Sequence, residues 1–156
     1  MLKIRILSIG DHKDKWIADG CDHYVKMLSR WASVEFVALP SPKSSSRLSQ
    51  TEIQKAESTR LLEAAGKGML VALTDSGKEF DSHGFARTLE KWHTTGGGTV
   101  CFLIGGPYGH HPDLLAKAPV ILSLSRLTFS HQLVRLVLLE QIYRAFTILH
   151  GTDYHK

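Results

Sequence analysis

The sequence predicts an α/β fold in which helices flank a mostly parallel sheet. Strand-like and helix-like segments alternate along the chain, which is typical of parallel strands joined by crossover helices. Two segments, MLVALT (69–74) and TVCFLI (99–104), are apolar on both faces, as strands covered by helices on both sides are. No internal repeat or second domain is evident, so the 156 residues are expected to form one domain, 1–156.

Two strands and one helix are predicted before residue 40. Residues 2–9 (LKIRILSI) alternate apolar and polar side chains in their first half, which indicates a strand. Residues 14–30 carry apolar side chains at helical spacing, and residues 33–39 (SVEFVAL) are predicted to form the second strand.

A flexible surface loop is predicted over residues 40–49, because Pro and Ser dominate PSPKSSSRLS; this loop includes Lys43 and Arg47. Ser49 and Glu52 have the spacing of a capping box, which predicts a helix that opens there and runs to about Ala65.

The middle of the chain predicts a third strand at residues 69–74, followed by a polar turn at residues 75–80. Asp81 or Ser82 is expected to cap the next helix, which ends at the glycine-rich turn TTGGG. A fourth strand (99–104), a fifth (119–125), a long final helix (130–150) and a short polar tail follow.

Composition narrows the class of protein. Apolar residues make up 43% and charged residues 22% of the chain, which is ordinary for a globular protein. No run of 18 apolar residues exists, and the N-terminal segment reads as a strand and not as a signal peptide, so a cytoplasmic location is expected. Cys21 and Cys101 are predicted to be buried thiols. A formal charge of +4 permits an RNA partner without requiring one.

The glycine turn in FLIGGPYGHH (102–111) lacks the features of a phosphate site. Neither G-x-x-x-x-G-K-[ST] nor G-x-G-x-x-G is present, and Pro107 removes one backbone N–H. Gly105 and Gly106 would still let a flat, uncharged group, such as the adenosine half of S-adenosylmethionine (SAM), lie against the backbone. A plain tight turn explains the glycines equally well.

A second segment favours a ligand site. Residues 122–135 leave a predicted strand through small hydroxyl residues and enter an apolar helix. The carboxyl ends of parallel strands are the usual ligand position in an open α/β sheet, so a pocket is expected where the third, fourth and fifth strands end.

The segments FLIGGPYG, LSLSRLTFSHQLVRLVLLEQIYRAF and the terminal YHK resemble the RlmH (YbeA) family of SPOUT-class methyltransferases, and the resemblance covers essentially the whole chain. It implies a SPOUT-type sheet with a C-terminal trefoil knot, a feature that pattern analysis alone would not propose. It also implies SAM as the methyl donor and N3 of a pseudouridine in large-subunit ribosomal RNA as the target. Recognition on the assembled ribosome by a homodimer fits this family.

The resemblance places the donor site on the loops that would form the knot. These positions are Leu73, Gly105, Gly106, Leu124, Ser125, Arg126, Leu127, Thr128 and Phe129. Ser130 stands where the family often has proline, and serine is expected to cap the helix that follows.

Four polar residues are candidates for the catalytic site: His131, Arg135, Tyr154 and His155. A loop histidine that bonds the backbone, or an arginine that pairs with a buried carboxylate, would also explain the first two. Chain ends are usually disordered, but the resemblance makes the tail part of the substrate site.

Two further features have simpler interpretations. His110 and His111 resemble a metal pair, but adjacent residues rarely bind one ion, so a solvated loop and no metal are expected. Glu140 and Arg144 have the spacing of an intrahelical ion pair.

The final helix is apolar around nearly its full circumference, which predicts burial against either the core alone or also a second subunit. Two functions compete with methyl transfer. One is a non-catalytic protein that binds RNA or the ribosome and retains the fold. The other is a nucleotide-binding α/β protein of another kind, which the missing phosphate motifs disfavour.

Overall fold

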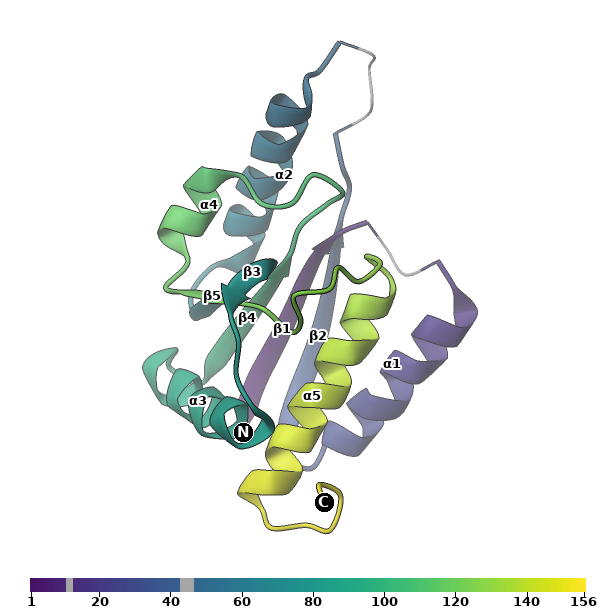
Figure 1. Ribbon diagram of the computed structural model, residues 1–156, viewed down its shortest axis with the longest axis vertical. Helices are drawn as coiled ribbons and strands as arrows, with labels where there is room; N and C mark the ends of the chain where they lie inside the picture. The colour runs from purple at the N-terminus through teal and green to yellow at the C-terminus, as the bar shows by residue number, and fades with distance from the viewer. Residues whose placement is uncertain (11–12, 43–46) are drawn as a thin grey trace.

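The computed structural model describes residues 1–10, 13–42 and 47–156. Its five strands form one parallel sheet in the order β2-β1-β4-β3-β5, which confirms the predicted α/β architecture (Figure 1). The strands are β1 (Leu2–Ile9), β2 (Ala32–Leu39), β3 (Met69–Lys78), β4 (Thr99–Ile104) and β5 (Val120–Leu122).

Helices cover both faces of the sheet. The helices are α1 (Lys15–Leu28), α2 (Gln50–Ala65), α3 (Ser82–Thr95), α4 (Pro112–Lys117) and α5 (Leu133–Leu149). Helices α1, α3 and α5 contribute to one hydrophobic core, whereas α2 and α4 contribute to a second core on the other face.

The central strands divide their side chains between these two cores. In β4, Val100, Phe102 and Ile104 belong to the first core, and Cys101 and Leu103 belong to the second. This alternation follows from the two-residue period of a strand, and it confirms that β4 is apolar on both faces. Both cysteines are buried and unpaired, as predicted.

Two predicted helix caps are confirmed. Ser49 and Glu52 form a complete capping box at the start of α2. Asp81 caps α3 by accepting a hydrogen bond from the Gly84 N–H. Lys43 of the predicted surface loop lies outside the described residues.

The ends of two strands differ from the prediction. Strand β3 continues through residues 75–78, where a turn was expected, and Lys78 pairs with Leu122 of β5. Gly77 permits this pairing, because a Cβ there would lie 2.7 Å from the Ile121 carbonyl oxygen. Strand β5 ends at Leu122, three residues earlier than expected, since the chain turns away to form the loop before α5.

A short helix, α4, was not predicted. Pro112 occupies its first turn, and the His111 side chain caps it by accepting a hydrogen bond from the Asp113 N–H at 3.1 Å. No helix among the described residues is long and apolar enough to cross a membrane.

Candidate donor pocket and the two ends of α5

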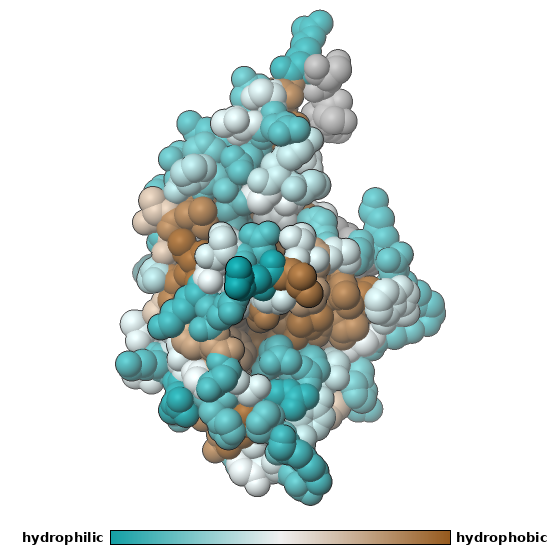
Figure 2. All heavy atoms as spheres, in the orientation of Figure 1, coloured by the Kyte–Doolittle hydropathy of each residue, from teal (hydrophilic) through white to brown (hydrophobic). Residues whose placement is uncertain are grey.

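A cavity of about 530 Å³ lies at the carboxyl edge of the sheet, where β3, β4 and β5 end. Its volume is within the range of small-molecule sites, and the position is the one expected for an open α/β sheet. Figure 2 shows hydrophobic residues gathered across the middle of this face, between α4 and the start of α5.

The cavity brings together most of the residues predicted to hold the donor. Those that line it are Leu73, Gly105, Gly106, Leu124, Ser125, Leu127, Thr128 and Phe129. Arg126 belongs to the same loop, but it is exposed and is not among the lining residues.

One face of α2 fixes the glycine turn that forms a wall of the cavity. The Gln54 side-chain amide donates hydrogen bonds to the carbonyl oxygens of Tyr108 (2.8 Å) and His110 (3.2 Å). The His111 N–H donates to the Ser58 hydroxyl at 2.9 Å. These three contacts hold the turn in place although it contains three glycines.

Glu57, between those two α2 residues, is buried directly behind Gly106. Its side chain is 1% exposed, and a Cβ at Gly106 would overlap its carboxyl oxygens. No described residue lies within 3.5 Å of either oxygen in hydrogen-bond geometry. Burial raises the pKa of this carboxyl, and the nearby Ser41 side chain and Arg60 charge oppose that rise. Only glycine at position 106 leaves room for the carboxyl.

His110 is not in a solvated loop, which corrects the prediction for this residue. It is 7% exposed, lines the cavity, and its Nε2 lies 3.0 Å from the Leu103 carbonyl oxygen. Because a carbonyl accepts, Nε2 carries the proton, and no described residue donates a hydrogen bond to Nδ1. Burial lowers the pKa of His110 against the opposing effect of the Leu103 and Leu73 carbonyls, which favours the neutral ring. The burial of His110 was not predicted, because the sequence was not recognised as forming α4 directly after this loop.

Hydroxyl side chains shape the loop from residue 123 to residue 132. The Ser123 hydroxyl donates to the Ser125 carbonyl at 2.9 Å, and the Ser125 hydroxyl accepts from the Leu127 N–H at 3.0 Å. Thr128 ties the loop to β3 by donating to the Asp75 carboxylate at 3.1 Å. Ser130 accepts a hydrogen bond from the Leu133 N–H at 3.2 Å, but the N-cap position of α5 is held by Gln132, whose side chain makes no cap hydrogen bond, so the expected serine cap is not found there.

His131 and Arg135 lie at this same end of α5. His131 lines the cavity, and burial together with the Arg135 charge lowers its pKa. Arg135 is 1% exposed and donates a hydrogen bond to the Gly10 carbonyl at 2.9 Å. Arg135 therefore acts on the cavity through its charge and through the position of α5.

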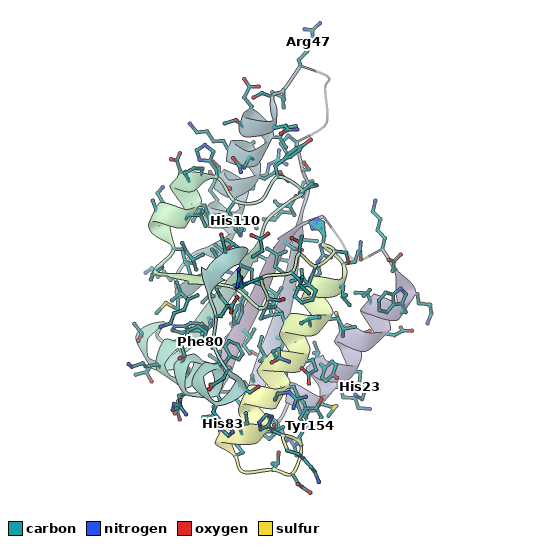
Figure 3. All side chains as sticks on the ribbon, viewed as in Figure 1. His23, Arg47, Phe80, His83, His110 and Tyr154 are labelled. Carbon is teal, nitrogen blue, oxygen red and sulfur yellow. The ribbon has the colours of Figure 1, made fainter. Side chains whose placement is uncertain are left out.

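Tyr154 and His155 lie at the other end of α5, away from the cavity (Figure 3). The Tyr154 hydroxyl donates to Glu140 at 2.9 Å, and its ring packs 4.8 Å from the Tyr143 ring. Arg144 Nη1 lies 3.1 Å from His155 Nδ1, and because a guanidinium N–H can only donate, Nδ1 is the acceptor. Burial, followed by the hydrogen bonds to Tyr24 and Glu140, raises the pKa of Tyr154, so its phenol stays protonated at neutral pH.

The predicted ion pair within α5 is present, with Arg144 Nη2 2.7 Å from Glu140 Oε1. This ion pair also holds the tail in place, because Arg144 contacts His155 and Glu140 accepts a hydrogen bond from Tyr154. Helix α5 has 17 residues and is roughly 25 Å long. Within one chain, the four predicted catalytic residues therefore form two separate pairs.

No cluster of three or more metal-ligating side chains is present in the part of the chain that the structure describes. Two acidic residues near the cavity were also missed by the sequence analysis. Asp75 was assigned to a turn, and Glu57 to an ordinary helix. The available signal for Asp75 was an acidic residue at the carboxyl end of a predicted strand, two residues after Leu73.

A family model described as "Predicted SPOUT methyltransferase" matches residues 2–155. The chain belongs to the SPOUT methyltransferase family. Three relatives named "Ribosomal RNA large subunit methyltransferase H" are similar to it over 99% of this chain and 100% of their own length. They are 43% identical in Desulfotalea psychrophila, 40% in Symbiobacterium thermophilum and 40% in Streptococcus pneumoniae. The resemblance inferred from the sequence is thereby confirmed.

One solved structure shares the fold of this chain despite low sequence identity. A probable methylase family protein from Haemophilus influenzae superposes with a TM-score of 0.61 at 13% identity, covering 100% of this chain and 72% of that one. At this identity the likeness concerns the fold alone.

Proposed function

We propose that this protein is a SAM-dependent methyltransferase that methylates N3 of a pseudouridine in large-subunit ribosomal RNA on the assembled ribosome. The observation that carries the activity is the 40–43% identity, over whole chains, with relatives named for methylation of that RNA. The cavity at the carboxyl edge of the sheet supports the donor site.

The residues of the cavity fit SAM. The volume suits a ligand of this size, and the walls combine apolar side chains with exposed backbone of the glycine turn. SAM has no phosphate group. The cavity agrees with this, because Pro107 offers no backbone N–H to an anion and no lysine is among the described lining residues. Leu73, Leu124 and Phe129 would enclose the adenosine, while Gly105 and Gly106 would let it approach the backbone.

When bound, the donor supplies an electrophilic methyl group on a sulfonium sulfur. The protein must hold the pseudouridine N3 in line with that methyl group and remove the N3 proton. His131 is the one predicted catalytic residue that lines the cavity, and its lowered pKa keeps a ring nitrogen unprotonated. We assign the proton to that nitrogen, with the buried Arg135 favouring the neutral ring until the proton transfers.

A role for the tail residues Tyr154 and His155 requires a homodimer. Tyr154 and His155 lie too far from the cavity of their own chain to contact a nucleotide bound there. In a dimer, the tail of one subunit would reach the cavity of the other, where the protonated Tyr154 hydroxyl could donate a hydrogen bond to the pseudouridine. The terminal Lys156 would add a positive charge near the RNA backbone.

Three further properties belong to the same proposal. We infer a C-terminal trefoil knot, formed where the loop from residue 123 to residue 132 passes the glycine turn. The ribosomal target places the protein in the cytoplasm. Arg126, exposed on the loop, is available to the RNA as well as to the donor.

Transfer of a radiolabelled methyl group from SAM tests the function. The acceptors are intact ribosomes, isolated large subunits and free large-subunit RNA, all from cells that lack this modification. We expect label at N3 of one pseudouridine, strongest with intact ribosomes, and located by mass spectrometry of nuclease fragments. Binding of SAM without label in any acceptor would indicate the non-catalytic, ribosome-binding alternative.

A further inference from the structure

The cavity has one side chain that is formally charged. Among the described lining residues, Asp75 is the sole aspartate, glutamate, lysine or arginine. It lies in β3, two residues after Leu73, and its carboxylate accepts the hydrogen bond from Thr128 across the cavity mouth.

The two histidines of the cavity do not offset this negative charge. Burial lowers the pKa of His110, and burial together with Arg135 lowers that of His131, so both rings are neutral at physiological pH. The cavity therefore has a formal charge of about −1 from its lining side chains.

The lysine and arginine side chains near Asp75 contact other groups. The Lys78 ammonium, on the same strand, lies 4.9 Å from the centre of the Phe80 ring. Arg135 is buried and donates to the Gly10 carbonyl, while Arg126 is exposed outside the lining. No described cation forms an ion pair with Asp75 within 4 Å.

We propose that Asp75 sets the preference of this cavity for the cationic methyl donor over its demethylated product. This inference rests on the proposed function, since it concerns the same donor. SAM has a net charge of +1, whereas S-adenosylhomocysteine has lost the sulfonium charge and is a neutral zwitterion. Asp75 is exposed to solvent, and its carboxylate, bound by Thr128, attracts the cationic donor more than the neutral product even though solvent screens part of the effect. Transfer of the methyl group then weakens the hold on the product and favours its release.

Isothermal titration of the full-length protein with SAM and with S-adenosylhomocysteine tests the proposal. We expect Asp75→Asn, which removes an exposed charge, to weaken SAM binding by about two- to five-fold and to leave S-adenosylhomocysteine binding nearly unchanged. Sinefungin, which carries an amine in place of the sulfonium, should follow SAM. Raising the salt concentration should reduce the preference for SAM in the native protein and not in the variant.

Two variants separate charge from loop structure. Thr128→Val removes the hydrogen bond to Asp75 and retains the charge, so the ratio of the two affinities should persist even if both weaken. Glu79→Gln removes an exposed carboxylate just beyond β3, outside the cavity, and should change neither affinity.

Equal weakening of the binding of all three ligands by Asp75→Asn would overturn the proposal. Asp75 would then only hold the loop in place through its hydrogen bond with Thr128. The failure of the native protein to bind either SAM or its product would instead contradict the proposed function itself. Circular dichroism and thermal unfolding identify any variant that has lost its fold.

Discussion

Around the glycine turn that forms one wall of the cavity, buried polar groups lack close hydrogen-bond partners, whereas at the end of α5 the tail residues are bound by a pair of charged side chains. The buried Glu57 carboxyl and His110 Nδ1 have no hydrogen-bond partner among the described residues, and Leu127 is 77% exposed. At the end of α5, Tyr154 and His155 bind the Glu140–Arg144 pair.

This difference indicates that a ligand binds at the cavity and not at the tail of the same chain. Buried polar groups without partners are costly, and an exposed leucine beside a cavity gains by being covered. The start of α5 is thus completed by something outside the chain. The tail is already ordered on its own chain, with Lys156 left exposed for another molecule.

Removal of residues 154–156 gives the largest expected effect. Methyl transfer should fall by at least about 100-fold, because groups that position or protonate a substrate contribute that much. The affinity for SAM should stay within about two-fold, since the proposed contact of the tail is with the pseudouridine and not with the donor. Radiolabel transfer and isothermal titration measure the two quantities. Asp153→Asn, which breaks only the exposed contact with Lys156, is the control and should transfer normally.

Leu127→Ala gives an intermediate effect at the opposite end. We expect about five-fold weaker binding of SAM, because part of an exposed leucine would be buried by the donor. The melting temperature should not change, since Leu127 is 77% exposed in the chain alone. Leu48→Ala removes another exposed leucine, outside the cavity, and should alter neither property. Unchanged SAM affinity in the Leu127 variant would remove the donor from this loop.

Glu57→Gln gives the smallest effect and measures the cost of the unpaired carboxyl. Because burial raises the pKa of Glu57, its stabilising contribution is present at low pH and is lost as the pH rises through the folded-state pKa. The variant should therefore be more stable than the native protein by about 1 kcal/mol at pH 7, and the difference should vanish near pH 4.

Urea unfolding at several pH values gives that difference directly. Glu63→Gln, an exposed position on the same helix, is the control and should show no comparable pH dependence. A Glu57→Gln variant that is less stable at pH 7 would show that the ionised carboxyl has a stabilising partner.

Much of the fold follows from local patterns in the sequence. The strand periods, the capping box at Ser49 and the cap at Asp81 are properties of neighbouring residues, and the structure confirms each of them. The continuation of β3 through residue 78 could not be predicted in this way. It depends on Gly77 meeting the backbone of β5, which is 44 residues away in the sequence.

The site was predictable in part for a related reason. The family resemblance located the two loops that line the cavity, because their residues are contiguous. Glu57, Asp75 and His110 were missed, since their roles depend on contacts between segments that are distant in the sequence. The separation of His131 from Tyr154 is likewise a property of the folded helix and not of the motif.

The central claim is that the two ends of α5 meet across a dimer, and complementation tests it most directly. His131→Ala and a chain ending at residue 153 are each expected to be inactive as homodimers. Co-expressed with different tags and purified as a heterodimer, they contain one intact loop and one intact tail that face each other. We predict roughly half of the native activity per dimer, because one of the two sites is complete. A heterodimer as inactive as its two parents, at normal SAM affinity of the truncated subunit, would contradict the account.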